Sequence, residues 1–401
     1  QPWTKIYGGA HSDVGRSVQQ TSDEGFIVTG SKSNLGGEAN NDVWLLKTDS
    51  NGEIIWEKTY ERSGSDAGHS VLQTKDGGYV IASEGFANLI KTDTDGNIIW
   101  DKYLSDRFYS VEATNDGGLI TVGTNMGYTG WEIYKLSLDG KTLWQKELNL
   151  PYGSAAKEVK KTKDDGFIIV GRVKVETMKY NLFGRKIDHM DVILLKIDKL
   201  GKEIWSKTIG GPNSEYAASV QQTIDGGYII AGHQSNENGV YDIWLLKTDS
   251  TGDIIWTKKF GETDIDEHCF SAQQTSDGGY ILTGTKLLKN NKGEVWVIKT
   301  DINGDLEWDA LIGADRPDIG YSIKETKEGG FIVAGTTTHL TGASYYDLIL
   351  IRITKDGKFI DIKSDSLVNT DSFINIKRKD YGDPAGSINW TYATPDFMEG
   401  M

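Results

Sequence analysis

The residues with the most varied chemistry in this sequence share one recurring position, which directly precedes a serine in similar segments along the chain. The residues at this position are Arg16, His69, Tyr109, Lys157, Ala218, Phe270 and Tyr321. In the fourth segment, Glu158 replaces the serine. A position that serves only packing would keep one residue type, whereas cations and aromatic rings around a concave mouth suit a polar ligand such as a glycan or a peptide. A solvated funnel without a ligand is the alternative.

Carboxylates stand near this position, in the variable segments that precede it. They are Asp13, Asp66, Asp106, Glu215, Asp264, Asp266, Glu267, Asp315 and Asp318. Hydrolysis of a glycosidic bond would require two carboxylates about 5–10 Å apart. The sequence offers many candidates but no unique pair, so we name no catalytic residue. Asp13, Asp66 and Asp266 are kept as candidate ligand-binding residues beside the varied position.

The histidines also fall in variable segments of the repeats. They are His11, His69, His189, His233, His268 and His339. Their spacings match no zinc pattern. We therefore expect no metal site and no cofactor, and we include His268 among the candidate ligand-binding residues.

A repeated unit must position these residues. Tight turns of the type Asp-Gly-Gly begin at Asp23, Asp76, Asp116, Asp164, Asp225, Asp277 and Glu328. Around the fifth turn, runs rich in β-branched and aromatic residues cover 219–223, 228–232, 242–249 and 253–258, which predicts four strands. A repeat of about 50 residues with four short strands is typical of propeller blades.

The last blade takes one strand from the other end of the chain. In six repeats a turn glycine is followed four residues later by tryptophan, but in the seventh by Asp361. Residues 2–9, which include Trp3, carry a spare copy of the missing strand. We predict an all-β fold, a seven-bladed β-propeller of four-stranded antiparallel blades whose ring is closed by the N-terminal strand. The propeller would span residues 1–362, and residues 363–401 would form a C-terminal segment with a rim strand and an irregular tail.

Residues that recur in the blades are predicted to be structural. A basic residue of the third strand, such as Lys247, recurs in every repeat, and we expect its charge near a turn carboxylate. The recurring tryptophan is expected to pack between blades rather than against a sugar. Asp49 and Asp93 begin turns that resemble the start of a calcium loop, but the carboxylate and helices that complete such a loop are missing. We expect these aspartates to accept N–H bonds within their turns.

The combined pattern resembles a known group of proteins. Asp-Gly-Gly-Tyr, an apolar strand and Asp-x-Trp-Leu-Leu-Lys-x-Asp-x-x-Gly-x-x-x-Trp are similar to secreted or surface β-propeller repeat proteins of bacteria and archaea. Residues 246–256 also resemble the tryptophan-docking repeat of PQQ-like, quinoprotein-type propellers. The resemblance covers roughly residues 2–360. Quinoprotein dehydrogenases have eight blades and an adjacent cysteine pair, whereas this chain has seven repeats and only Cys269, so quinone binding is not carried over.

The composition argues against several kinds of partner. With 58 acidic and 43 basic residues the formal net charge is -15, which repels nucleic acid and anionic membranes. No apolar run approaches the ~20 residues needed to span a bilayer. No basic and then apolar signal segment opens the chain. We expect an extracellular or cell-surface location, with the signal peptide absent from this sequence.

Three functions fit these features. The first is a non-catalytic extracellular or cell-surface binding module that recognises a glycan, a peptide or a protein at the variable-loop face. The second is a polysaccharide-active enzyme, a glycosidase or lyase, with carboxylates at the channel mouth. The third is a structural subunit of a surface assembly. The sequence contains no recognisable catalytic triad and no metal-ligand spacing, which favours the binding module.

Overall fold

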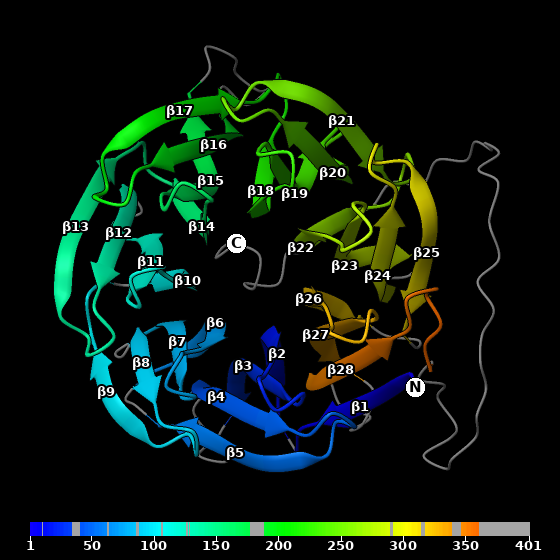
Figure 1. The fold of residues 1–401 in the computed structure, drawn as a ribbon. Helices are drawn as coiled ribbons and strands as arrows, with labels where there is room; N and C mark the ends of the chain where they lie inside the picture. Colours follow the sequence, from blue (N-terminus) through cyan, green and yellow to red (C-terminus); the bar gives the residue numbers. More distant parts are fainter. Residues whose placement is uncertain are drawn as a thin grey trace.

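The computed structural model describes residues 1–9, 11–33, 41–61, 64–85, 88–105, 107–125, 127, 129–176, 188–288, 292–313, 317–338 and 346–360. All regular elements in these residues are strands, so no helix there is long and apolar enough to cross a membrane. The strands form seven four-stranded antiparallel blades around a central axis (Figure 1). The predicted fold class is confirmed.

The strands of each blade follow one order from the axis outward. The inner strands are β2 (Asp13–Gln20), β6 (Ala67–Gln73), β10 (Arg107–Ala113), β14 (Ala155–Lys161), β18 (Glu215–Gln222), β22 (Glu267–Gln274) and β26 (Ile319–Glu325). The second strands are β3 (Phe26–Ser33), β7 (Tyr79–Glu84), β11 (Leu119–Thr124), β15 (Phe167–Val175), β19 (Tyr228–Ser235), β23 (Tyr280–Leu288) and β27 (Phe331–Thr337). The third strands are β4 (Asn41–Thr48), β8 (Leu89–Thr92), β12 (Gly130–Leu136), β16 (His189–Ile197), β20 (Tyr241–Thr248), β24 (Lys292–Thr300) and β28 (Asp347–Ile353). The outer strands are β5 (Ile54–Tyr60), β9 (Ile98–Lys102), β13 (Thr142–Asn149), β17 (Glu203–Ile209), β21 (Ile254–Phe260), β25 (Leu306–Ile312) and β1 (Trp3–Tyr7).

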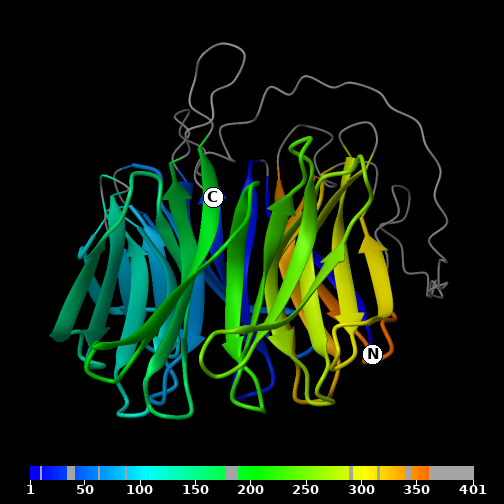
Figure 2. The same cartoon turned by 90° about the horizontal axis from the view of Figure 1, so that it is seen from above.

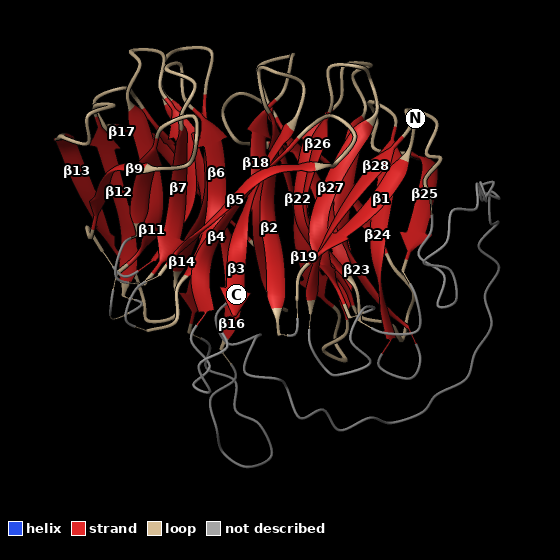
Figure 3. Cartoon of the chain, turned by 90° about the horizontal axis from the view of Figure 1, so that it is seen from below, coloured by secondary structure: helices blue, strands red, loops and turns tan. Residues whose placement is uncertain are grey.

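The two faces of the ring differ in their connections. The turns from inner to second strands, and from third to outer strands, lie on one face (Figures 2 and 3). The connections that enter the inner strands or join second to third strands lie on the opposite face, which we call the variable face. Variable connections on a rigid scaffold are where binding sites are usually built.

The N-terminal strand closes the ring, as predicted. β1 pairs antiparallel with β28, from Trp3 opposite Arg352 to Tyr7 opposite Leu348. Thr4 Oγ1 also donates a hydrogen bond to the carbonyl oxygen of Ile360. The last blade therefore contains both the first strand of the chain and its last described strand.

The recurring basic residue forms one ion pair in each blade. Lys247 Nζ lies 2.9 Å from Asp225 Oδ2 and donates to the carbonyl oxygen of Thr248 at 2.9 Å. The same pair recurs as Lys47–Asp23, Lys91–Asp76, Lys135–Asp116, Lys196–Asp164, Lys299–Asp277 and Arg352–Glu328. The position is structural, and its charge meets the carboxylate of the Asp-Gly-Gly turn as expected.

The recurring tryptophan packs against the following blade. The ring centroids of Trp56 and Tyr79 are 5.9 Å apart. Gly96 has a φ of 77°, and a Cβ there would come within 2.8 Å of the Trp56 ring, so glycine is required for both conformation and space. Tyr60 Oη donates to the Gly96 carbonyl oxygen at 2.8 Å. The predicted inter-blade role of the tryptophan is confirmed.

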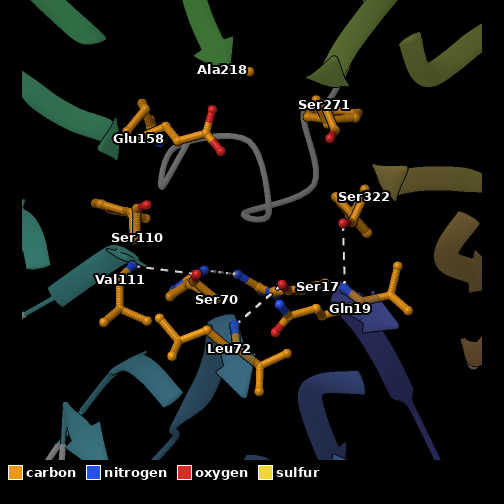
Figure 4. A pocket seen from close by; sticks show the side chains of 18 of the residues that line it. Ser17, Gln19, Ser70, Leu72, Ser110, Val111, Glu158, Ala218, Ser271 and Ser322 are labelled. Carbon is orange, nitrogen blue, oxygen red and sulfur yellow. Dashed lines mark hydrogen bonds between the residues drawn. The ribbon is translucent and has the colours of Figure 1, made fainter. Parts of the chain in front are cut away.

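A ring of hydrogen bonds around the axis explains the recurring serine. Ser17 Oγ accepts the backbone N–H of Val71 in the next blade at 3.3 Å. The equivalent bonds run from Val111 to Ser70 and from Val18 to Ser322 (Figure 4), and from Val159 to Ser110 and Ile323 to Ser271. Glu158 Oε2 accepts from Val220 at 2.7 Å, and Ser219 Oγ donates to the Ala272 carbonyl oxygen at 3.0 Å. Every junction between blades is thus bridged at this level.

The turns between third and outer strands are also structural. Asp49 Oδ1 accepts the backbone N–H groups of Asn51 and Glu53, both at 2.8 Å. This confirms the predicted turn role of Asp49. Within the described ranges, no group of three or more histidine, cysteine or acidic side chains is arranged to hold a metal ion.

Candidate functional site

Each varied residue is the extra residue of a β-bulge in its inner strand. Pairing between β2 and β3 passes from Gly15–Gly30 to Ser17–Thr29 and skips Arg16. The same shift skips His69, Tyr109, Lys157, Ala218, Phe270 and Tyr321. A bulge bends its strand and re-aims the extra side chain. All seven residues consequently line one pocket, of about 380 Å³, which we call the channel-mouth pocket.

The structure brings most of the predicted ligand-binding residues together. Arg16, His69, Tyr109, Lys157, Phe270, Tyr321 and His268 all line the channel-mouth pocket. Its volume lies within the range of ligand-binding sites. The bulges place the pocket at the axis, near the ends of the inner strands that face the variable loops.

The predicted carboxylates lie elsewhere, at the corners where chains enter the inner strands. Asp13 is buried and accepts the backbone N–H of Ser33 at 3.2 Å. Asp66 is equally buried, and Asp266 Oδ1 accepts the backbone N–H of Tyr241 at 2.9 Å. Glu215 and Glu267 are buried as well and accept the backbone N–H groups of residues 211 and 262. Asp13, Asp266, Glu215 and Glu267 thus hold the backbone of the corners. None of these acids, Asp66 included, lines the pocket, and Asp106 and Asp315 lie outside the described residues.

Besides Ala217 and Ala218, four lining residues with polar or charged side chains were not among the predicted set, namely Arg172, Tyr216, His233 and Tyr241. A comparison across repeats contains a signal for two of them. Five residues after the first aromatic or leucine of the second strand stand Ser31, Glu84, Thr124, Arg172, His233, Thr285 and Thr336. Most are small hydroxyl residues, so the charged or imidazole exceptions mark a second position where the repeats diverge in chemistry.

The histidines are on strands more often than expected. His69 and His268 belong to inner strands, His233 to a second strand, and His189 begins β16. His189 Nε2 lies 3.2 Å from Asp191 Oδ1, and His339 lies outside the described residues. Only some of the histidines therefore contribute to the pocket.

Two cations of the channel-mouth pocket lie over tyrosine rings. Lys157 Nζ lies 4.3 Å from the centroid of the Tyr109 ring, and Arg172 Cζ lies 5.6 Å from that of Tyr216. Burial, together with the nearby charges of Arg172 and Arg16, lowers the pKa of Lys157 to about 7, although Glu84 opposes this. Lys157 is thus poised between its charged and neutral forms near neutral pH.

Four polar side chains contact one another in series at the pocket, in the order Arg16, His69, Glu84 and Arg107. Arg16 Nη1 lies 3.0 Å from His69 Nδ1, and because arginine only donates, this nitrogen accepts. His69 Nε2 lies 3.5 Å from Glu84 Oε2, which is 3.2 Å from Arg107 Nε. Burial and the Arg16 charge lower the pKa of His69 to about 4, so this ring is neutral at pH 7. Although burial alone would raise it, the His69 and arginine contacts lower the pKa of Glu84 to about 2.

The remaining aromatic rings of the pocket pack against one another. The rings of His233 and His268 are 4.6 Å apart, and Tyr241 packs 5.3 Å from each of them. Phe270 and Tyr321 are 5.2 Å apart. Burial lowers the pKa of both His233 and His268, so these rings are also neutral at physiological pH.

A second cavity of about 220 Å³ lies at the serine ring and shares all seven bulge residues with the channel-mouth pocket. Figure 4 shows the serines and Glu158 around this part of the axis. Lys160 Nζ lies 3.3 Å from both Glu112 Oε2 and Glu158 Oε1. Lys324 lines the same cavity, so its two acids are matched by two lysines.

Comparison with known proteins agrees with the sequence pattern. The family model described as outer membrane protein assembly factor BamB matches residues 41–308. No curated protein matches the chain.

Several solved structures share the fold. The WD40 domain of Neurospora crassa Pan2 is 9% identical, with a TM-score of 0.52, and the match covers 86% of this chain and 89% of that one. Sqt1 from Chaetomium thermophilum is 11% identical, with a TM-score of 0.53 and coverage of 89% and 85%. Puromycin hydrolase is 12% identical, with a TM-score of 0.53, and the match covers 86% of this chain and 52% of that one. At these identities the likeness concerns the fold alone.

Proposed function

Because the chain belongs to the family described as outer membrane protein assembly factor BamB, we propose that it is a non-catalytic binding module whose ligand enters the channel-mouth pocket. One observation carries the proposal: every varied residue is a bulge residue, and all seven bulges aim at one pocket. The residues that pack the blades together recur from blade to blade. Their differences gather where a ligand can be contacted.

The proposed partner is a glycan, a peptide or a protein, and the proposed location is extracellular or at the cell surface. The name of the family, which refers to outer membrane protein assembly, supports a partner that is itself a polypeptide. A role as a subunit of a surface assembly is compatible with the same pocket. The acidic protein surface makes nucleic acid an unfavourable partner.

An enzyme acting on polysaccharides is less well supported. Among the described residues, no carboxylate lines the channel-mouth pocket. Glu112 and Glu158 in the second cavity are both held by Lys160, so neither is placed as an independent acid or base.

The proposal is tested by a screen of glycan and peptide arrays with the purified protein, followed by affinity measurements. The double substitution Tyr109→Ala and Tyr321→Ala should weaken binding about tenfold or more, because aromatic anchors usually carry much of the binding energy. The matched control is Tyr103→Ala with Tyr152→Ala, since these exposed tyrosines precede inner strands but do not line the pocket. The proposal is wrong if the control pair weakens binding as much as the pocket pair.

A further inference from the structure

The charge of the channel-mouth pocket is opposite to that of the whole protein. The formal net charge is -15, yet the pocket is lined by Arg16, Lys157 and Arg172 and, in the described part of the chain, by no acidic residue. We infer that the pocket binds the C-terminal carboxylate of a polypeptide together with its last, apolar side chain. This inference rests on the proposed binding function and specifies its ligand.

The arginines leave hydrogen-bonding capacity for an anion. Arg16 Nε is buried and has no hydrogen-bond partner among the described residues, although Nη1 contacts His69. A buried donor of this kind is costly unless something accepts its hydrogen bond. Arg172 Nε donates to the Gly153 carbonyl oxygen at 3.2 Å, while its guanidinium carbon lies over Tyr216. The two guanidinium groups therefore present fixed donors at the pocket, and arginine suits carboxylates because it donates two parallel bonds.

The remaining walls favour an apolar group beside the carboxylate. Phe270, Tyr321, Tyr241, Ala217 and Ala218 supply ring faces and methyl groups. Sugar hydroxyls need paired donors and acceptors, which the described lining offers only as tyrosine hydroxyls and histidine nitrogens, because it contains no asparagine, glutamine, aspartate or glutamate. A C-terminal residue needs only anion donors and an apolar cavity. A peptide end is thus a better fit than an acidic sugar.

The position of the pocket favours an end of a chain. It is lined by inner-strand residues of all seven blades and continues into the cavity at the serine ring, so a ligand enters along the axis rather than across an open groove. A volume of about 380 Å³ accommodates the last two or three residues of a peptide. The net negative charge of the protein disfavours peptides with acidic residues upstream of their last residue.

The test uses fluorescein-labelled hexapeptides that differ in their last residue, each synthesised with a free C-terminal carboxylate and as the C-terminal amide. Fluorescence anisotropy with the full chain should show that free acids ending in phenylalanine, tyrosine or leucine bind about tenfold or more tightly than their amides. Arg172→Gln should reduce the free acid to the affinity of the amide and leave the amide unchanged. Lys207→Gln on an outer strand is the control and should change neither.

The outcomes separate this inference from the proposed function. Equal affinity for acid and amide, with both lost in the Tyr109→Ala, Tyr321→Ala variant, overturns the inference and leaves the binding module intact. Binding of oligoglucuronate in preference to every peptide overturns it in favour of an acidic glycan. Binding that is indifferent to both the tyrosine pair and Arg172→Gln overturns the inference and the proposed function together. The acid–amide comparison needs no variant, so it remains decisive even if Arg172→Gln fails to fold.

Discussion

Removing the exposed carboxylate of Asp225 is expected to destabilise the propeller more than removing the buried lysine with which it pairs. The side chain of Lys247 is 5% exposed, whereas that of Asp225 is 60% exposed. Asp225→Ala leaves the Lys247 ammonium group buried, with a hydrogen bond of 2.9 Å to the Thr248 carbonyl oxygen but without its carboxylate. Lys247→Met instead leaves a carboxylate that water already reaches.

The expected magnitudes follow from this asymmetry. Removing one partner of a fully buried ion pair costs about 3–5 kcal/mol. Because Asp225 is largely exposed, water can partly solvate the ammonium after its removal, and we expect about 2–3 kcal/mol for Asp225→Ala. Lys247→Met keeps the packing of the aliphatic stem and loses one bond to a carbonyl group, which is about 1 kcal/mol. The double variant should resemble Lys247→Met alone.

Urea unfolding at pH 7, followed by tryptophan fluorescence, measures these differences. Asp225→Asn serves as the control that keeps the size of the side chain and removes its charge. Although burial would raise it, bonds from Thr223 and Lys247 lower the pKa of Asp225 to about 2. A depressed carboxyl pKa stabilises the fold above the ordinary value near 4, and this contribution is lost as pH falls towards 2. The reasoning is refuted if Lys247→Met destabilises the protein as much as Asp225→Ala does.

Three further outcomes are expected. Deletion of residues 1–9 should lower the calorimetric melting temperature by several degrees, because β28 would lose its outer partner and the ring would no longer be closed. An unchanged melting temperature would mean that the ring is closed by another route. Affinity for the free-acid peptide should fall as pH rises through about 7, because the ammonium group of Lys157 deprotonates there. The variant Lys157→Met should bind the peptide with little dependence on pH. If the native protein already shows no change in affinity between pH 6 and about 8.5, Lys157 does not contact the carboxylate of the peptide. Trp256→Ala should lower the free energy of unfolding in urea by about 3 kcal/mol. This is the low end of the range for a large aromatic residue, because the ring is only half-buried. An effect below about 1 kcal/mol would show that the contact with Tyr280 contributes little.

The repeated part of the fold could be predicted from the sequence because the same short sequence motifs recur in each blade. Each motif can be recognised within one repeat: the Asp-Gly-Gly turn, the third-strand lysine and the inter-blade tryptophan. Their recurrence predicted the ring and its closure by the strand that contains Trp3. The varied residues were found in the same way, by their failure to repeat.

The rest of the site depends on contacts that no single repeat contains. Arg16 occupies a bulge because the pairing of β2 with β3 shifts by one residue there. The sequence pattern does not reveal this shift in register. Tyr216 and Tyr241 reach the pocket from different strands and pack against each other and against His233. The acids such as Asp13 look like ligands in the sequence, but burial at the blade corners directs their oxygens to backbone N–H groups. Sequence spacing alone does not distinguish these two environments.

The pairing of β1 with β28 also determines how the molecule would respond to mechanical load. Trp3 lies opposite Arg352 and Tyr7 opposite Leu348, so residue 1 and residue 360 both leave the ladder at the Trp3 end. Tension applied between these two residues would peel the strands apart one hydrogen bond at a time, rather than shear all of them together. The ring would therefore open first in its last blade and at low force, while the other blades keep all four of their strands.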